Sequence, residues 1–152
     1  MPAKPVQVRD NGRTYWSTGW HVIRWSERNC VFTNGSWTGK PFRLLPWQIR
    51  TIQRLFEVNP NTGLRKYRRA LIGIPRKNGK TELAAALALY LVAADDEPSA
   101  EVYAAASSED QADRVFDAAK RMVTMGPLSE ILDVAASRIS LKSQPYSYLQ
   151  RL

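Results

Sequence analysis

The residues with the clearest chemical potential lie together at Gly79, Lys80 and Thr81. A short apolar run precedes them and a long Ala/Leu-rich segment follows them. A strand, a tight loop ending in Gly-Lys-Thr and a helix is the arrangement that a phosphate-binding loop requires. In such a loop Lys80 would reach the β- and γ-phosphates of a nucleotide, and Thr81 would place its hydroxyl on Mg²⁺. The spacing therefore predicts a site for ATP and Mg²⁺, with Thr81 as the metal-binding residue.

The other residues of the loop support the same chemistry. Gly79 lets the backbone turn without a Cβ in the way, and the following helix directs its unpaired N–H groups at the bound anion. Arg76 would stabilise charge on the γ-phosphate, so Arg76 and Lys80 are the expected catalytic residues; the alternative for Arg76 is a side chain that points to water. The loop residues expected to bind the nucleotide are Pro75, Arg76, Lys77, Asn78, Gly79, Lys80, Thr81 and Glu82.

The loop departs from the general pattern G-x-x-x-x-G-K-[ST] at its first position. The first glycine should stand at residue 74, which is Ile74, and Gly73 lies one position early. The alternative interpretation is an ordinary turn before a helix whose first turn happens to read Gly-Lys-Thr. The flanking elements favour the phosphate-binding loop, because its strand and helix define it as much as its letters do.

The elements around the loop predict an α/β fold. Residues 68–74 form a brief apolar run that Pro75 stops, which predicts a short buried strand. Residues 80–94 contain no Gly or Pro and predict a helix. A second strand is expected over 100–105, followed by a helix that Ser107 or Ser108 caps and that runs to about Met125. The alternation of strands and helices predicts a parallel sheet flanked by helices, similar to that of the phosphate-loop NTPases.

Further elements are expected on both sides of this unit, including a helical N-terminal segment. They are a loose arm over 1–16 with a turn at Asn11-Gly12, a helix over 17–29 capped by Ser17, a helix over 47–57 with Pro46 in its first turn, a short helix over 129–134, and strands over 138–141 and 146–149.

Length and composition set the limits of these interpretations. The chain has 152 residues, which suits one domain of ordinary size. The sequence has no run of 18 apolar residues, so no membrane-spanning helix is expected. Cys30 is the single cysteine, which excludes an internal disulfide framework and indicates a small buried hydrophobe in a cytoplasmic protein.

The charge is spread unevenly along the chain. Residues 1–82 carry 16 Lys/Arg against 4 Asp/Glu, a net of +12, whereas residues 83–152 carry 6 against 10, a net of −4. Clustered cations of this kind neutralise phosphates on a nucleotide or a nucleic acid. The alternative is a solvated face, which we favour for the run Arg65, Lys66, Arg68 and Arg69.

Three segments stand in a recognisable order. Residues 37–48 end in an L-x-P-W-Q pattern that leads into a helix, residues 74–81 form the loop, and residues 102–112 combine a strand, a polar turn and Asp-Gln-Ala. Together they resemble the large terminase subunit of tailed bacteriophages, the ATP-driven motor that packages viral DNA. The family typically lacks the first loop glycine and carries an early basic residue, so Ile74 and Arg76 fit it better than the general pattern. The resemblance implies that Gln48 recognises adenine; without it, Gln48 would simply start a helix.

The resemblance extends over roughly residues 17–150 and implies a motor component. In the intact family member, ATP hydrolysis drives DNA translocation, and a nuclease cleaves concatemeric DNA. The implied partners are double-stranded DNA, a portal protein, a small terminase subunit and further copies of the chain, in the host cytoplasm. We expect residues 17–152 to be the N-terminal portion of the ATPase domain, without its acidic strand or the nuclease, and therefore to bind ATP better than they hydrolyse it.

Two other interpretations stay open at this stage. One is a non-enzymatic basic module that binds DNA or supports assembly, in which Gly79, Lys80 and Thr81 have no nucleotide to hold. The other, weaker one is a fragment of a helicase of related fold, which would carry DNA-unwinding motifs further downstream.

Overall fold

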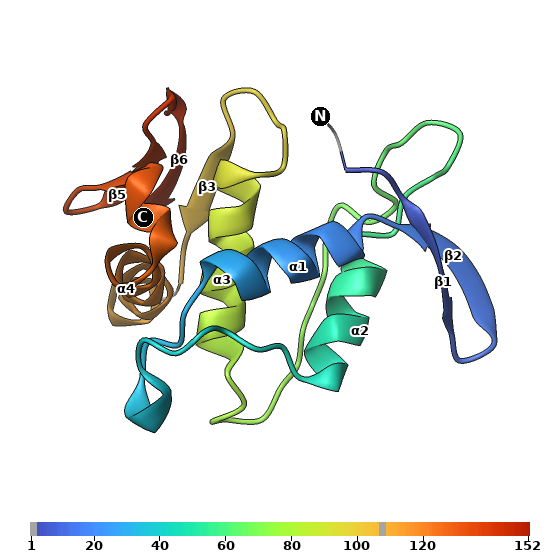
Figure 1. Ribbon diagram of the computed structural model, residues 1–152, viewed down its shortest axis with the longest axis horizontal. Coiled ribbons are helices and arrows are strands. Elements are labelled where there is room, and N and C mark those ends of the chain that lie inside the picture. Colours follow the sequence, from blue (N-terminus) through green and yellow to red (C-terminus); the bar gives the residue numbers. More distant parts are fainter. Residues whose placement is uncertain (1–2, 107–108) are drawn as a thin grey trace.

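The computed structural model describes residues 3–106 and 109–152, without the side chains of residues 109–112. The helices are α1 (Gly19–Asn29), α2 (Pro46–Leu55), α3 (Lys80–Ala93) and α4 (Glu109–Met125), with 3₁₀ turns η1 (Gly35–Trp37) and η2 (Pro127–Glu130). The strands are β1 (Val6–Asp10), β2 (Arg13–Ser17), β3 (Glu101–Ala104), β4 (Leu132–Val134), β5 (Arg138–Leu141) and β6 (Gln144–Arg151) (Figure 1).

Helix α3 stands at the centre of the fold. It follows the loop directly and is apolar on most of its circumference, which is the composition of a buried helix. Leu83, Leu89 and Tyr90 are almost fully buried, and α4 and the sheet lie on the opposite side of α3 from α2 in Figure 1. The helix predicted over 80–94 is confirmed.

The main sheet is mixed rather than parallel. Its strand order is β3-β6-β5-β4, and only the β3–β6 pair is parallel. The physical reason is loop length, because the connections after β4 and β5 are too short for the crossover that parallel neighbours need. The strands predicted over 138–141 and 146–149 are confirmed, whereas the helix predicted over 129–134 is wrong: its residues divide between η2 and β4.

The segment that leads into the loop is extended but forms no strand. The strand predicted over 68–74 is therefore wrong: none of its residues pairs with a described strand, and Leu71 is wholly exposed. Backbone N–H and C=O groups form a strand only when a neighbour satisfies them. The run is apolar, but none of its residues has a neighbouring strand with which to form a ladder of hydrogen bonds.

The N-terminal residues form a hairpin in place of the expected loose arm. Strands β1 and β2 pair with Val8 opposite Tyr15, and the predicted turn at Asn11 and Gly12 is confirmed, with φ values of 48° and 76°. Ser17 ends β2 instead of opening a helix, and its Oγ accepts a hydrogen bond from the Gly19 N–H at 2.9 Å. The helix predicted over 17–29 therefore begins two residues later than expected.

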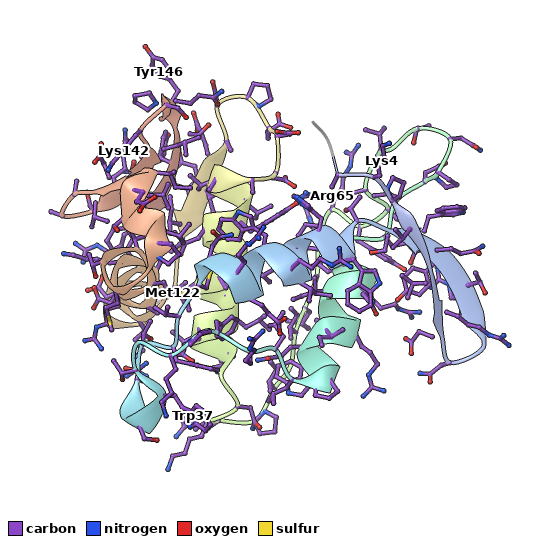
Figure 2. The ribbon with its side chains drawn as sticks, viewed as in Figure 1. Lys4, Trp37, Arg65, Met122, Lys142 and Tyr146 are labelled. Atoms are coloured by element: carbon purple, nitrogen blue, oxygen red, sulfur yellow. The ribbon has the colours of Figure 1, made fainter. Side chains whose placement is uncertain are left out.

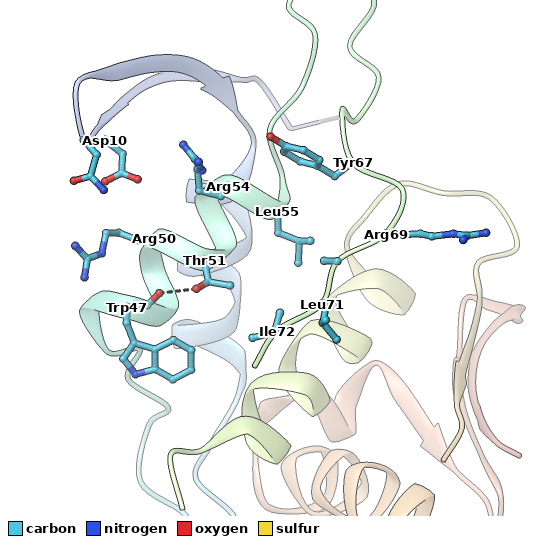
Figure 3. Close-up of a pocket in the computed structure, with 12 residues that line it drawn as sticks. Asp10, Trp47, Arg50, Thr51, Arg54, Leu55, Tyr67, Arg69, Leu71 and Ile72 are labelled. Carbon is cyan, nitrogen blue, oxygen red and sulfur yellow. Dashed lines mark hydrogen bonds between the residues drawn. The ribbon is translucent and has the colours of Figure 1, made fainter. Parts of the chain in front are cut away.

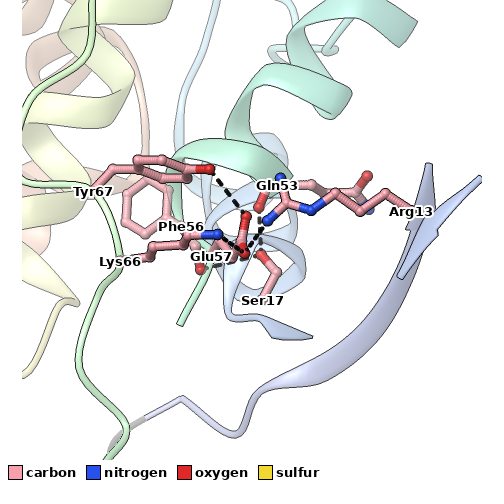
Figure 4. A network of polar contacts seen from close by, with 7 residues as sticks. All are labelled: Arg13, Ser17, Gln53, Phe56, Glu57, Lys66 and Tyr67. Atoms are coloured by element: carbon pink, nitrogen blue, oxygen red, sulfur yellow. Dashed lines mark hydrogen bonds and ion pairs between the residues drawn. The ribbon is translucent and has the colours of Figure 1, made fainter. Parts of the chain in front are cut away.

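A buried carboxylate ties this hairpin to the chain that approaches the loop. Glu57 Oε1 accepts hydrogen bonds from Arg13 at 2.6 Å and from Lys66 at 3.0 Å, and Glu57 Oε2 accepts one from the Tyr67 hydroxyl at 3.4 Å (Figure 4). The Ser17 hydroxyl donates to the Gln53 carbonyl in α2 at 2.7 Å. These contacts join β2, the end of α2 and residues 65–67 into one frame.

Candidate nucleotide site

The backbone of the loop is strongly curved just before α3. Lys77 and Gly79 both have left-handed conformations, with φ values of 66° and 71°. The Asn78 side chain closes the turn, because its Nδ2 donates to the carbonyls of Pro75 at 3.3 Å and Arg76 at 3.2 Å. Gly79 is the N-cap residue, so the free N–H groups of the first turn of α3 face the space above the loop. Such a curved backbone at a helix N-terminus is a concavity suited to anions.

A groove of about 1120 Å³ opens above this loop. Three cations of the loop, Arg76, Lys77 and Lys80, line it and are exposed, and the half-buried Thr81 lies beside them. Of the residues predicted to bind a nucleotide, the groove brings together Arg76, Lys77, Asn78, Gly79, Lys80, Thr81 and Glu82. Pro75 is not among the described residues that line the groove.

Gln48 lies against the loop from the side of α2. Its side chain is 3% exposed, and Oε1 accepts a hydrogen bond from the Leu45 N–H at 2.8 Å, which satisfies a donor at the start of the helix. A Cβ on Gly79 would lie 3.6 Å from Nε2 of Gln48. Gln48 thus starts α2 and also contacts the loop, and recognition of adenine stays a prediction.

Glu82 serves as a tether in the first turn of α3. Its Oε1 accepts hydrogen bonds from both the N–H and the hydroxyl of Thr33, each at 2.8 Å. Thr33 is buried, so this carboxylate fixes the chain around η1 to the start of α3. Glu82 is the only carboxylate among the described residues that line the groove, and its contact with a nucleotide stays a prediction.

None of the other described carboxylates lines the groove. Asp95 follows the C-terminal end of α3, about 20 Å from Lys80 at 1.5 Å per residue. It is ion-paired with Arg65, and burial raises the pKa of Asp95 against the opposing effect of Arg65. Within the described residues, no group of three or more His, Cys, Asp or Glu could hold a metal ion.

Three residues of the groove carry no local signal in the sequence. Asn34 reaches it from the chain before η1, and Arg114 and Val115 reach it from α4. Arg114 and Val115 meet the loop because α4 packs on α3, with Phe116 and Met122 in the shared core. Asn34 meets it because the neighbouring Thr33 is bound to Glu82. A local sequence pattern does not predict packing between distant segments of this kind.

All four cations of the basic run 65–69 are exposed, as expected, but two of them are also engaged in ion pairs. Arg65 stacks over the Phe56 ring at 4.6 Å in addition to its ion pair with Asp95, and Lys66 is paired with Glu57. Arg68 and Arg69 are exposed, as expected.

Residues 68–74, which lead into the loop, are the approach segment. A second groove of about 550 Å³ lies on the other side of this segment (Figure 3). Trp47 and Arg50 of α2, Tyr67 and Ile72 line it, and Ile72 also lines the groove above the loop.

Cys30 is buried away from both grooves, and burial raises the pKa of its thiol to about 12. Among the described helices, none has the length and apolar character needed to cross a membrane.

Comparison with known proteins agrees with this geometry. The family model described as the ATPase domain of the terminase large subunit matches residues 46–142. The large terminase subunit of Enterobacteria phage HK97 is 34% identical over 129 residues, which are 84% of this chain and 25% of that protein. The crystal structure of the HK97 large terminase superimposes with a TM-score of 0.73 at 30% identity, over 90% of this chain and 27% of that one.

The chain thus spans about a quarter of the length of these relatives. The family match covers most of the chain and includes the loop, α3, α4 and the strands β3 to β5. The resemblance seen in the sequence is confirmed: this chain belongs to the family of terminase large subunits, within its ATPase domain.

Proposed function

We propose that this chain is the ATP-binding part of a DNA-packaging motor, with a loop of the phosphate-loop NTPase type. One observation carries the proposal: in a terminase ATPase domain, the groove at the N-terminus of α3 gathers Arg76, Lys77 and Lys80 around a loop with two left-handed residues. Exposed cations and free N–H groups in a concavity fit a polyphosphate, since both neutralise and bind phosphate oxygens.

Each residue of the site is proposed to contact a different part of ATP. The loop N–H groups and Lys80 bind the β- and γ-phosphates, and Arg76 adds positive charge beside the γ-phosphate. The Thr81 hydroxyl is the ligand offered to Mg²⁺, which when bound neutralises phosphate charge. We assign the base to Gln48, whose Nε2 lies beside Gly79 and which is not among the described residues that line the groove.

We expect slow hydrolysis by this chain on its own. Glu82 is the only described carboxylate of the groove, and Thr33 already occupies its Oε1 through two hydrogen bonds. Activation of a water molecule needs an acceptor within hydrogen-bond reach. Binding of ATP with little turnover is therefore the expected behaviour, and brisk turnover by the 152-residue chain would contradict it.

Lys80→Ala tests the nucleotide site. We expect the variant to bind ATP roughly 10- to 100-fold more weakly, the effect of losing one charge-assisted hydrogen bond. Titration calorimetry with ATP and Mg²⁺ measures it. The matched control is Lys120→Ala, because Lys120 is exposed on α4 and does not line the groove. Equal affinities of the two variants and the unmodified chain would refute the site.

The remaining expectations concern the intact protein. As a terminase large subunit, it would couple ATP hydrolysis to translocation of double-stranded DNA, cleave concatemeric DNA, assemble with further copies of itself, and work with a portal protein and a small terminase subunit in the host cytoplasm. We include these activities in the proposal because the chain belongs to the family of terminase large subunits, and the relatives that it matches extend well beyond the quarter of their length that it covers.

A second candidate function is a basic DNA-binding or assembly module. The observation that favours it is the net charge of +12 on residues 1–82, with Arg68 and Arg69 exposed beside the loop. Retained DNA binding together with unchanged ATP binding in Lys80→Ala would support this function over the first.

A further inference from the structure

The nucleotide groove has one cation that does not come from the loop. Arg114 lies in α4, which is on the opposite side of α3 from α2 (Figure 1), and it lines the groove beside Val115. The pattern of the loop does not predict it, because it stands 34 positions after Lys80 (114 minus 80). It reaches the groove through the packing of α4 on α3.

The position of Arg114 is fixed by its helix. Phe116, Ala119 and Met122 of α4 are at most 1% exposed in the core shared with α3. One residue before Arg114, the Asp113 carboxylate accepts a hydrogen bond from Arg151 of β6 at 2.6 Å, which ties the start of α4 to the sheet. The backbone of Arg114 is thereby held in place before any ligand arrives, and the planar guanidinium is itself rigid, so less freedom is lost for each hydrogen bond formed.

The guanidinium itself is available to a ligand. Arg114 is exposed and forms no ion pair or hydrogen bond with the described side chains, and its neighbour Asp113 is already engaged by Arg151. Arginine presents several N–H donors in a planar fork that matches phosphate oxygens. A phosphate group is therefore the ligand chemistry that this side chain fits best.

We infer that Arg114 contacts the terminal phosphate of the bound triphosphate from across the groove. This inference rests on the nucleotide site proposed above. Gln48 reaches the loop from α2, whereas Arg114 reaches the groove from α4, which lies on the other side of α3 (Figure 1). With the β-phosphate on the loop, the terminal phosphate is the group that a cation entering the same groove from α4 can reach. Arg114 thereby distinguishes a triphosphate from a diphosphate.

Titration of the full chain with ATP and with ADP, each with Mg²⁺, tests the inference. We expect Arg114→Ala to weaken ATP binding by roughly 10-fold or more while the affinity for ADP changes less than about twofold. Arg114→Lys should recover part of the loss, because it keeps the charge but not the planar fork. Lys120→Ala, on the same helix outside the groove, is the control. Thermal unfolding of each variant confirms that it is folded.

The outcomes separate this inference from the nucleotide site itself. Loss of ATP binding in Lys80→Ala with unchanged binding in Arg114→Ala would overturn the role of Arg114 and leave the site intact. An equal loss for ATP and ADP in Arg114→Ala would overturn the assignment to the terminal phosphate. Failure of the unmodified chain to bind either nucleotide would overturn both proposals.

Discussion

At the scale of single residues, Gly79 gives the loop the backbone turn that its proposed phosphate site requires. Its φ of 71° lies in the left-handed region, and it is the N-cap of α3. A Cβ there would meet only Nε2 of Gln48 at 3.6 Å, an ordinary contact. The requirement for glycine is therefore conformational and not a lack of space, since L-residues pay about 1–2 kcal/mol in this region.

Gly79→Ala should lower both the free energy of unfolding and the affinity for ATP. We expect about 1 kcal/mol of lost stability, and several-fold weaker ATP binding as the loop relaxes toward another conformation. Gly12→Ala is the matched control, because Gly12 also has a positive φ, 76°, with nothing within 4 Å of a new Cβ. Urea unfolding and calorimetry should show similar destabilisation in both variants but weaker ATP binding in Gly79→Ala alone. Equal ATP affinities would mean that the geometry of the loop does not govern binding.

At the scale of elements, helices α1 and α2 are held together by a close backbone contact. Gly19 opens α1 directly against α2: a Cβ on Gly19 would lie 2.7 Å from the Gln53 Cα and 3.0 Å from the Ser17 Oγ. The first of these atoms belongs to the backbone and cannot turn aside. The approach of α1 to α2 therefore requires the absence of a side chain at this position.

Gly19→Ala should push α1 away from α2 and destabilise the fold. We expect a loss of about 1–3 kcal/mol in the free energy of unfolding, the usual effect of overpacking. The control is Gly73→Ala, where a Cβ meets nothing within 4 Å and φ is not positive, so its stability should change by less than about 0.5 kcal/mol or rise slightly. Chemical denaturation measures both. Equal stabilities would show that α1 and α2 can separate without loss.

The elements also show which features a local pattern can predict. The helices α2 and α3 were predicted within two residues, because apolar spacing and the absence of Gly and Pro are local properties. The strand over 68–74 and the parallel sheet were predicted wrongly, since both depend on which segments become neighbours. The site divides in the same way: the loop residues followed from their spacing, whereas Arg114 required the packing of α4 on α3.

At the scale of the whole molecule, part of the net charge of +12 on residues 1–82 is engaged in ion pairs. In the N-terminal half, Arg13 and Lys66 share the single carboxylate of Glu57, Arg65 is paired with Asp95, and Arg43 lies 3.7 Å from Glu27. Trp37 projects at the end of the molecule near the loop, with Lys40 over its ring at 4.8 Å, far from Lys142 and Tyr146 (Figure 2). Of the cations in residues 1–82 that make no described ion pair, Arg68, Arg69, Arg76, Lys77 and Lys80 lie on the loop and on the approach segment before it, and the others lie elsewhere on the chain.

This distribution makes DNA binding separable from ATP binding. We expect the chain to bind double-stranded DNA weakly through Arg68 and Arg69, which are exposed and make no described ion pair. The double variant Arg68→Ala/Arg69→Ala should reduce the slope of log affinity against log salt by about 2, since each lost phosphate contact removes about 0.9. Its ATP affinity should stay unchanged, and Lys80→Ala should show the converse. Fluorescence anisotropy with a DNA duplex at several salt concentrations measures the slope. If Lys80→Ala alone abolished DNA binding, the groove itself would be the DNA contact, and one cationic surface would serve both ligands.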